Sequence, residues 1–279
     1  MAIVLYAWVT GIHRELRVPC DSAVSPTYVT LNDEERGPPS DMPPDFSRRS
    51  YEPERLDTGD YTPVEYEECL VELRRVNRWL GDAHALRHSV LAAVGRDGLK
   101  EFSLLDVGAG SGELLRASAL WARREKRGAR LVGLELNARA ARAVLEESAE
   151  FEEVRAVRAD ALRMPFADGA FDYVMCSLFT HHFRDDAVVA LLREMSRVAR
   201  RRVFVIDLHR HRVAHLFYTT VARLFLRSPL VREDGALSIL RGFVPAELRR
   251  LAERAGLSEV EVRRRFPYRL VLSARARES

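Results

Sequence analysis

The stretch Phe102-Ser-Leu-Leu-Asp-Val-Gly-Ala-Gly-Ser-Gly112-Glu113 decides the fold. An apolar run from Phe102 to Val107 leads into three glycines at alternate positions, and the helical pattern 114–121 follows at once. A strand that turns sharply into a helix needs glycine, which takes positive φ at little cost and lets a ligand approach the backbone. The helix start then offers unpaired N–H groups and a positive dipole end to an anionic group. The stretch therefore predicts a nucleotide-type site on a doubly wound sheet.

The spacing of the glycines distinguishes this site from a dinucleotide-binding one. A dinucleotide fingerprint has glycine at its first, third and sixth positions, whereas the sixth position counted from Gly108 is Glu113. Asp106 followed by Gly108, Gly110 and Gly112 instead resembles motif I of the class I S-adenosylmethionine-dependent methyltransferases. Taken by itself, the stretch also fits a tight strand–helix turn that binds no ligand.

Three later segments add to this resemblance, which is close over about residues 100 to 210. The segment 129–135 ends in Glu135, and in the family an acid there accepts hydrogen bonds from the two ribose hydroxyls. Asp160-Ala161 stands where the family contacts the edge of adenine, and Phe171-Asp172 opens a fourth strand, 171–176. The resemblance implies S-adenosylmethionine as the cofactor, with no metal. The implied cofactor contacts are Asp106, Gly108, Ala109, Gly110, Gly112, Glu135, Leu136, Asp160, Ala161 and Cys176.

Strand and helix patterns alternate after this stretch. Helices are expected at 114–127, 138–149 and 186–199, and strands at 130–135, 154–158, 171–176 and 202–207. Such alternation makes right-handed crossovers and a parallel sheet. A helix at 245–256 and strands at 259–264 and 269–276 fit the family's final hairpin. We predict an α/β, Rossmann-like, doubly wound seven-stranded sheet, mostly parallel with a C-terminal antiparallel hairpin. The expected methyltransferase domain is 61–279, with N-terminal helices at 61–98 and a helical cap insertion at 209–242.

Composition limits the other classes of protein. A hydrophobic share of 47% and a charged share of 30% suit a globular chain with a real core. Cys20, Cys69 and Cys176 match no metal spacing, which predicts a reducing, cytoplasmic location. No apolar run approaches the roughly 20 residues that a membrane span requires. Residues 199–279 carry 18 arginines and 8 acids, a surplus that fits either an anionic partner or solvated surface faces.

The N-terminal part has a different character. Residues 1–60 are expected to be a disordered extension, because 8 of the 12 prolines fall within 1–65. Met1 to Ile12 lacks the basic start of a signal peptide, and residues 1–41 are suspected to lie upstream of the native start. A helix is predicted to begin with Thr62 as N-cap and Pro63 next. The run 73–81 resembles a segment that precedes small bacterial methyltransferase domains and folds over the cofactor, so that Trp79 is either a substrate contact or a core tryptophan.

The insertion at 209–242 is the least generic part of the chain. Apolar residues at helical spacing from Val213 to Phe225 predict an amphipathic helix with arginines around it. In the usual layout of the family, such an insertion caps the substrate pocket, and Leu216, Phe217 and Val221 are then substrate contacts. A helix that packs on the sheet and a helix that lies on a membrane surface are the alternatives.

Two histidines and an acid are the candidates for chemistry. His181 and His182 follow the fourth strand, and Asp207 ends the fifth. A base near neutral pKa helps to deprotonate a hydroxyl acceptor, although a structural role for the histidine pair is equally open. The Asn/Asp-Pro-Pro-Tyr/Phe motif of amino-methylating enzymes is missing, since those positions read Cys176-Ser-Leu-Phe179.

The sequence thus predicts a methyltransferase for a small apolar or aromatic metabolite of secondary or quinone-type metabolism, with oxygen as the first acceptor atom and carbon as the second. An RNA methyltransferase acting on ribose or ring carbon, and a non-catalytic cofactor-binding protein, are the alternatives. The expected partner is a small molecule; nucleic acid and peripheral membrane contact are less favoured.

Overall fold

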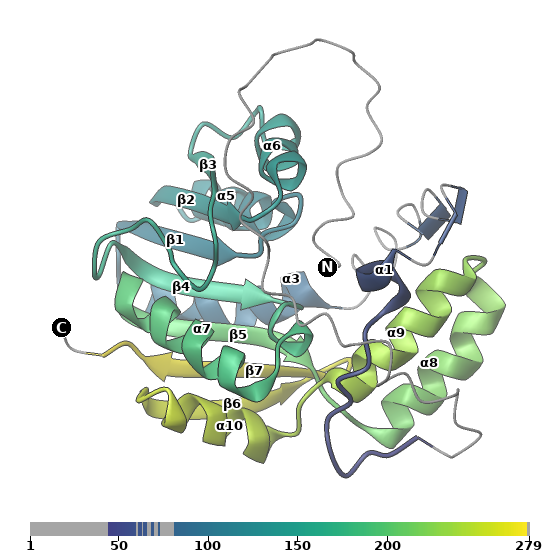
Figure 1. Cartoon of the computed structure of the whole chain (residues 1–279). Coiled ribbons are helices and arrows are strands. Elements are labelled where there is room, and N and C mark those ends of the chain that lie inside the picture. Colours follow the sequence, from purple (N-terminus) through teal and green to yellow (C-terminus); the bar gives the residue numbers. More distant parts are fainter. Residues whose placement is uncertain are drawn as a thin grey trace, which may run out of the picture.

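A seven-stranded sheet organises the chain in the computed structural model, which describes residues 44–59, 61, 62, 64, 65, 68, 69, 72 and 81–277 (Figure 1). The strand order is β3-β2-β1-β4-β5-β7-β6, and β7 runs antiparallel to both β5 and β6. The predicted fold class is confirmed. The strands are β1 (Glu101–Val107), β2 (Gly128–Glu135), β3 (Val154–Arg158), β4 (Phe171–Ser177), β5 (Ala199–Leu208), β6 (Ser258–Arg265) and β7 (Arg269–Arg275).

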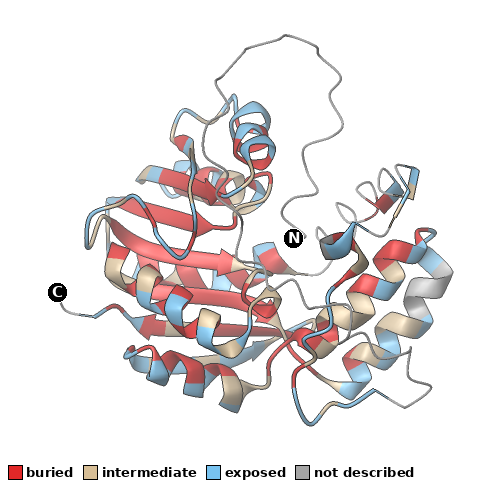
Figure 2. Ribbon diagram, viewed as in Figure 1, coloured by how far each residue is buried: buried red, intermediate tan, exposed pale blue. Residues whose placement is uncertain are grey.

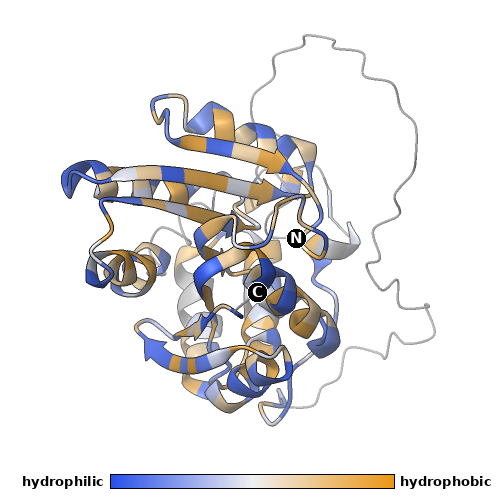
Figure 3. Cartoon of the chain, turned by 90° about the vertical axis from the view of Figure 1, so that its left-hand side faces the viewer, coloured by the Kyte–Doolittle hydropathy of each residue, from blue (hydrophilic) through white to orange (hydrophobic). Residues whose placement is uncertain are grey.

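Helices cover both faces of this sheet. One face carries α3 (Asp82–Leu86), η3 (Arg87–Leu91), α4 (Ala92–Arg96) and α5 (Glu113–Arg124), and the opposite face carries α7 (Asp185–Val198) and α10 (Pro245–Arg254). The helix α6 (Ala138–Glu147) packs on β2 and β3. The inner strands are buried between these layers (Figure 2) and carry many of the hydrophobic residues (Figure 3), whereas the edge strand β6 has no buried residue. No described helix is both long and apolar enough to cross a membrane.

The observed elements differ from the predicted ones mainly at their ends. The fifth strand begins at Ala199 and not at Arg202, because Ala199 pairs with Phe171 of β4 and Arg202 pairs with Arg275 of β7. Three consecutive arginines at 200–202 do not predict a strand by their own preferences. They lie in one because strands elsewhere in the chain pair with this segment. For the same reason β2 begins at Gly128, opposite Glu101.

The insertion forms two helices, where the sequence predicted one. The first, α8 (Arg212–Phe225), corresponds to the predicted helix, and α9 (Pro229–Arg241) lies against it at the edge of the molecule away from β3 (Figure 1). The pair packs closely because Gly235 has no side chain: a Cβ there would lie 2.0 Å from the Tyr218 hydroxyl oxygen. That hydroxyl donates to the Val231 carbonyl at 2.5 Å.

Residues 44–59, which belong to the predicted N-terminal extension 1–60, make polar contacts with the rest of the molecule, whereas residues 1–43 lie outside the described residues. Arg49, Glu54 and Leu56 are buried there. The short helix α1 (Arg55–Thr58) begins where the Asp234 carboxylate accepts hydrogen bonds from the amides of Arg55 and Leu56, at 2.8 and 3.0 Å. Composition suggested disorder because apolar residues are scarce, but buried ion pairs and backbone hydrogen bonds hold the segment instead.

The predicted helix start at Thr62 is confirmed. The Thr62 amide donates to Glu65 at 2.8 Å, and the Glu65 amide donates back to the Thr62 hydroxyl at 3.3 Å, which is a capping box. The Glu72 carboxylate accepts from the amides of Arg227 and Ser228, at 2.6 and 3.0 Å, and so contacts the start of α9. Trp79 lies outside the described residues.

Candidate active site

The glycine loop between β1 and α5 adopts the backbone that the sequence predicts. Gly108, Gly110 and Gly112 have φ values of 76°, 59° and 81°, a region that side chains rarely occupy. The Gly108 amide donates to the Leu134 carbonyl at 2.8 Å, which ties the loop to β2. A Cβ at Gly110 would meet no atom within 4 Å, so the space beside this residue is open to a ligand.

Two buried carboxylates lie beside this loop. Asp106 near the end of β1 and Glu135 at the end of β2 are 2% and 3% exposed. Glu135 accepts the Gly110 amide at 2.6 Å, whereas Asp106 Oδ1 has no partner within the described residues. Burial raises the pKa of Asp106 to about 7 and, together with the nearby Asp106 charge, that of Glu135 to about 8. A buried acceptor without a donor fits a cofactor with hydroxyl and amino groups.

The remaining predicted cofactor contacts have different surroundings. Asp160 is exposed and accepts the Leu162 amide at 2.8 Å, Ala161 is buried, and Leu136 is 43% exposed at the mouth of the site. Cys176 is completely buried in the core on the α7 face, and burial raises its thiol pKa well above the usual value. Side chains alternate along a strand, so Ser177 points to the other face. Its hydroxyl lacks a described partner, and it is a better candidate contact than Cys176.

A histidine and an aspartate meet at the ends of β4 and β5. The 3-10 turn η4 (Thr180–His182) follows β4 and places His181 Nδ1 2.6 Å from Asp207 Oδ1. Asp207 is fully buried and also accepts from the Thr180 hydroxyl and from the amides of His181 and Leu208. Burial would raise the pKa of Asp207, but the His181 imidazole and these hydrogen bonds hold it well below its usual range. Asp207 is therefore placed to orient His181, and a role of its own as base or substrate contact stays a prediction.

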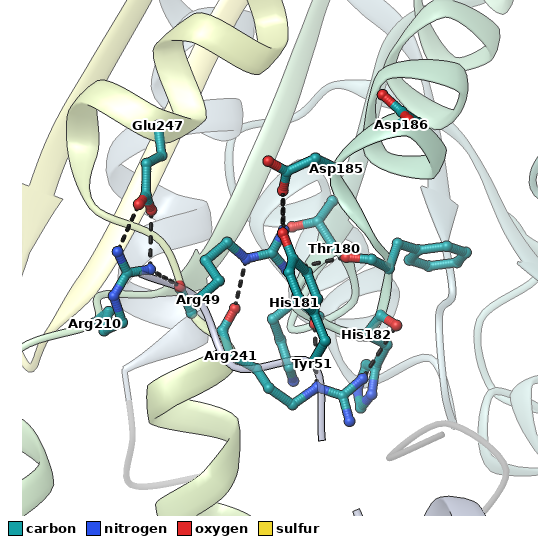
Figure 4. A network of polar contacts seen from close by, with 12 residues as sticks. Arg49, Tyr51, Thr180, His181, His182, Asp185, Asp186, Arg210, Arg241 and Glu247 are labelled. Atoms are coloured by element: carbon teal, nitrogen blue, oxygen red, sulfur yellow. Dashed lines mark hydrogen bonds and ion pairs between the residues drawn. The ribbon is translucent and has the colours of Figure 1, made fainter. Parts of the chain in front are cut away.

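Two buried arginines fix the histidine turn from the other side (Figure 4). Arg49 donates to the carbonyls of His181 and Phe183 and pairs with Asp185 at 2.7 Å. Arg241, at the end of α9, donates to the carbonyls of His181 and His182 at 3.3 and 3.1 Å. Neither arginine could be found from the sequence, because isolated arginines in an arginine-rich chain carry no periodic or motif signal.

Glu54, brought in by the segment 44–59, reaches the same histidines. One ligand-type atom each from Glu54, His181 and His182 lies within 4.8 Å of the others. Two imidazoles and a carboxylate are a donor set that can hold a transition metal. Two guanidinium groups close by oppose a further cation, since Arg241 lies 3.8 Å from Glu54 Oε1. The absence of a metal stays a prediction.

The structure describes the side chains of two of the three predicted substrate contacts on α8. Leu216 and Phe217 on α8 are 62% and 60% exposed, which contradicts a helix packed on the sheet through these residues. Val221 lies on α8, but its side chain is outside the described part of the chain. Whether Leu216 and Phe217 touch an acceptor stays a prediction.

Comparison with known proteins agrees with this geometry. Residues 105–206 match a family model described as a methyltransferase domain. No curated protein matches the sequence. Three solved structures share the fold at identities of 11–17%. An Aquifex aeolicus SAM-dependent methyltransferase matches at 17% identity and TM-score 0.52, over 73% of this chain and 98% of that one. Magnesium protoporphyrin IX methyltransferase from Synechocystis PCC 6803, with bound SAH, matches at 16% and 0.50, over 78% and 89%.

The third is the CurJ carbon methyltransferase, at 11% identity and TM-score 0.59, over 80% of this chain and 63% of that one. The chain also spans 52% of the length of a longer Nostoc punctiforme PCC 73102 protein assigned as an O-methyltransferase. At such identities these likenesses show the fold, and the family model adds the domain over the strands that carry the acids and glycines. The chain therefore contains a class I S-adenosylmethionine-dependent methyltransferase domain.

Proposed function

We propose that the chain methylates a hydroxyl oxygen of a small apolar or aromatic metabolite of secondary or quinone-type metabolism. The observation that supports this most directly is the His181–Asp207 pair, 2.6 Å apart, at the ends of β4 and β5. Parallel strands end at one edge of the sheet, so this pair shares an edge with Asp106 and Glu135. Such an edge is where doubly wound sheets bind their ligands.

The paired aspartate determines which imidazole nitrogen can act as a base. Asp207 is ionised and can only accept, so in the neutral imidazole the proton lies on Nδ1 of His181. The lone pair on Nε2 is then available to take a proton from an acceptor hydroxyl. Bound S-adenosylmethionine supplies an electrophilic methyl group, which Asp106, Gly110 and Glu135 would position for in-line approach.

The insertion supports an acceptor of low polarity. Its second helix, α9, ends at Arg241, which contacts both histidine carbonyls, so the α8–α9 pair adjoins the proposed base directly. Phe179 and Phe183 flank the histidines, with ring centroids 4.9 Å apart, and are partly buried against the core. Aromatic rings beside the base favour an aromatic acceptor through edge-to-face contacts. Carbon is the second choice of acceptor atom.

Labelled cofactor tests this proposal in two stages. Incubation of the protein with metabolite extracts should label a small apolar product, and label in RNA would contradict the proposal. With that acceptor, His181→Ala should lower kcat by about 10²–10⁴-fold, the usual contribution of a general base, and leave SAH affinity intact. His84→Ala is the matched control, because His84 lies on α3 and contacts His88. An unchanged kcat in His181→Ala would remove this histidine from the mechanism.

A further inference from the structure

The outward face of α8 is apolar, which is the reverse of an ordinary surface helix. Val213, Leu216 and Phe217 are 52%, 62% and 60% exposed, and Thr220 on the same side is exposed too. These positions have the i, i+3, i+4, i+7 spacing of one helix face. The opposite side is the packed one, where Ala214 is buried and the Tyr218 hydroxyl donates to α9. Contiguous exposed apolar side chains of this kind mark an interaction surface.

Within the sequence from 208 to 232, which contains α8, the charged side chains are of one sign. Residues 208–232 contain five arginines (Arg210, Arg212, Arg223, Arg227 and Arg232) and neither aspartate nor glutamate. Arg210 forms a buried ion pair with Glu247 and is not available to a partner. Arg212 is exposed and directly precedes Val213. An apolar helix face flanked by arginines complements a layer of anionic headgroups above hydrocarbon. A second, acidic protein surface would satisfy the arginines but would leave the aliphatic and aromatic side chains less well matched.

The position of α8 links this face to the active site. The helix follows β5 after a short turn, and β5 ends at the sheet edge that carries Asp207 and the histidines. In Figure 1, α8 lies at the outside of the molecule, with α9 between it and the sheet. A flat surface that meets the outer side of α8 would therefore lie on the side of this helix that faces away from α9 and the sheet.

We propose that α8 docks on an anionic bilayer surface through Val213, Leu216 and Phe217. Docking does not depend on which acceptor is methylated. The consequence that a lipophilic acceptor enters from the bilayer does rest on the proposed function. Peripheral contact of this kind needs no spanning helix, in agreement with the described helices.

Vesicle flotation of the full chain tests the docking. The protein should float with vesicles of phosphatidylcholine and phosphatidylglycerol and should float weakly with phosphatidylcholine alone. Added salt should reduce flotation, because it screens the arginines. Val213→Asp and Phe217→Asp should each lower the bound fraction by about ten-fold or more, since a charge placed in the acyl boundary opposes burial.

Phe266→Asp is the matched control, because Phe266 is 84% exposed on the β6–β7 turn and outside α8. It should float like the wild type. Unchanged SAH affinity by calorimetry shows that the variants are folded. Equal flotation of Phe217→Asp and wild type would overturn the proposal. So would a wild-type protein that does not bind vesicles but forms dimers, if Val213→Asp abolishes those dimers. Failure of the proposed function is separate: it would appear as absent turnover in a protein that still floats.

Discussion

At the scale of single residues, Asp106 and Glu135 show what the sequence can and cannot supply. Their positions at two strand ends were predictable, because an acid before the glycines and an acid ending the next strand match the family pattern. Their protonation was not predictable. It depends on complete burial and on the Coulomb repulsion between two carboxyl groups that lie close together. A ribose hydroxyl that donates to Glu135 would favour the ionised form of this carboxyl group, as the Gly110 amide already does.

Glu135→Ala should weaken SAH binding by roughly 1.5–3 kcal/mol, the range for hydrogen bonds to charged groups. Glu146→Ala is the control, since Glu146 lies exposed on α6. Calorimetry with SAH measures both variants. Equal affinity in Glu135→Ala and wild type would show that the ribose hydroxyls have another partner.

Stability should also depend on pH through Glu135. Its pKa, raised to about 8 in the folded protein, is near 4.5 when unfolded. Between these values the folded state holds more protons, so the free energy of unfolding falls as pH rises, by on the order of 1 kcal/mol per pH unit. Glu135→Gln should flatten this decline without abolishing it, because Asp106 behaves similarly. Urea unfolding of the apoprotein at pH 5.5, 6.5 and 7.5 measures the slopes, and parallel slopes would contradict the shift.

At the scale of elements, the strands with alternating or continuous apolar residues were predictable and α9 was not. The α8 pattern is strongly periodic, whereas α9 begins Pro-Leu-Val-Arg-Glu-Asp-Gly and has no clear apolar stripe. Buried Asp234 and the close approach of Gly235 to Tyr218 replace that stripe. Sequence periodicity detects helices that bury one continuous apolar face, whereas α9 combines a few buried apolar residues with polar and steric contacts.

Gly235→Ala should destabilise the protein by about 1–3 kcal/mol, because its methyl group would overlap the Tyr218 hydroxyl. Alanine's higher helix propensity, worth up to about 1 kcal/mol, opposes this loss only in part. Gly95→Ala on α4 provides the contrast: its Cβ would meet nothing within 4 Å, so stability should rise by about 0.5–1 kcal/mol. Urea unfolding gives the free energy of unfolding of both variants. An increase in Gly235→Ala would contradict the close packing and would mean that α8 and α9 separate easily.

At the scale of the whole molecule, the site is closed by residues far apart in the chain. Arg49 donates to Arg241 across 192 residues and to His181 across 132. No local pattern encodes such contacts, which is why the surroundings of the histidines were missed. The resemblance predicted only acids and glycines that stand at strand ends in the sequence. The guanidinium also lies 4.0 Å from the Phe243 ring centroid. A fork of five donors serves these partners together.

Arg49→Lys should therefore cost about 2 kcal/mol of stability despite its conserved charge, because a single ammonium cannot reach all of these acceptors. It should also lower kcat, since the carbonyls of the histidine turn lose a donor. Arg48→Lys is a close control: the neighbouring side chain is 86% exposed and should be neutral. The free energy of unfolding and kcat are measured for both variants. Equal values in Arg49→Lys and Arg48→Lys would contradict the role of Arg49.

The strand order β5-β7-β6 has a consequence for synthesis on the ribosome. In the described sheet β6 pairs with β7 alone, yet β6 leaves the exit tunnel first. In the sheet, β7 lies between β5 and β6. Until β7 emerges, β5 therefore presents an open hydrogen-bonding edge, and β6 has no neighbouring strand with which to pair. Open edges of this kind recruit strands from other chains. The nascent chain is thus at its most adhesive after β6 has left the tunnel and before β7 has followed, and binding by a chaperone would matter most in that interval.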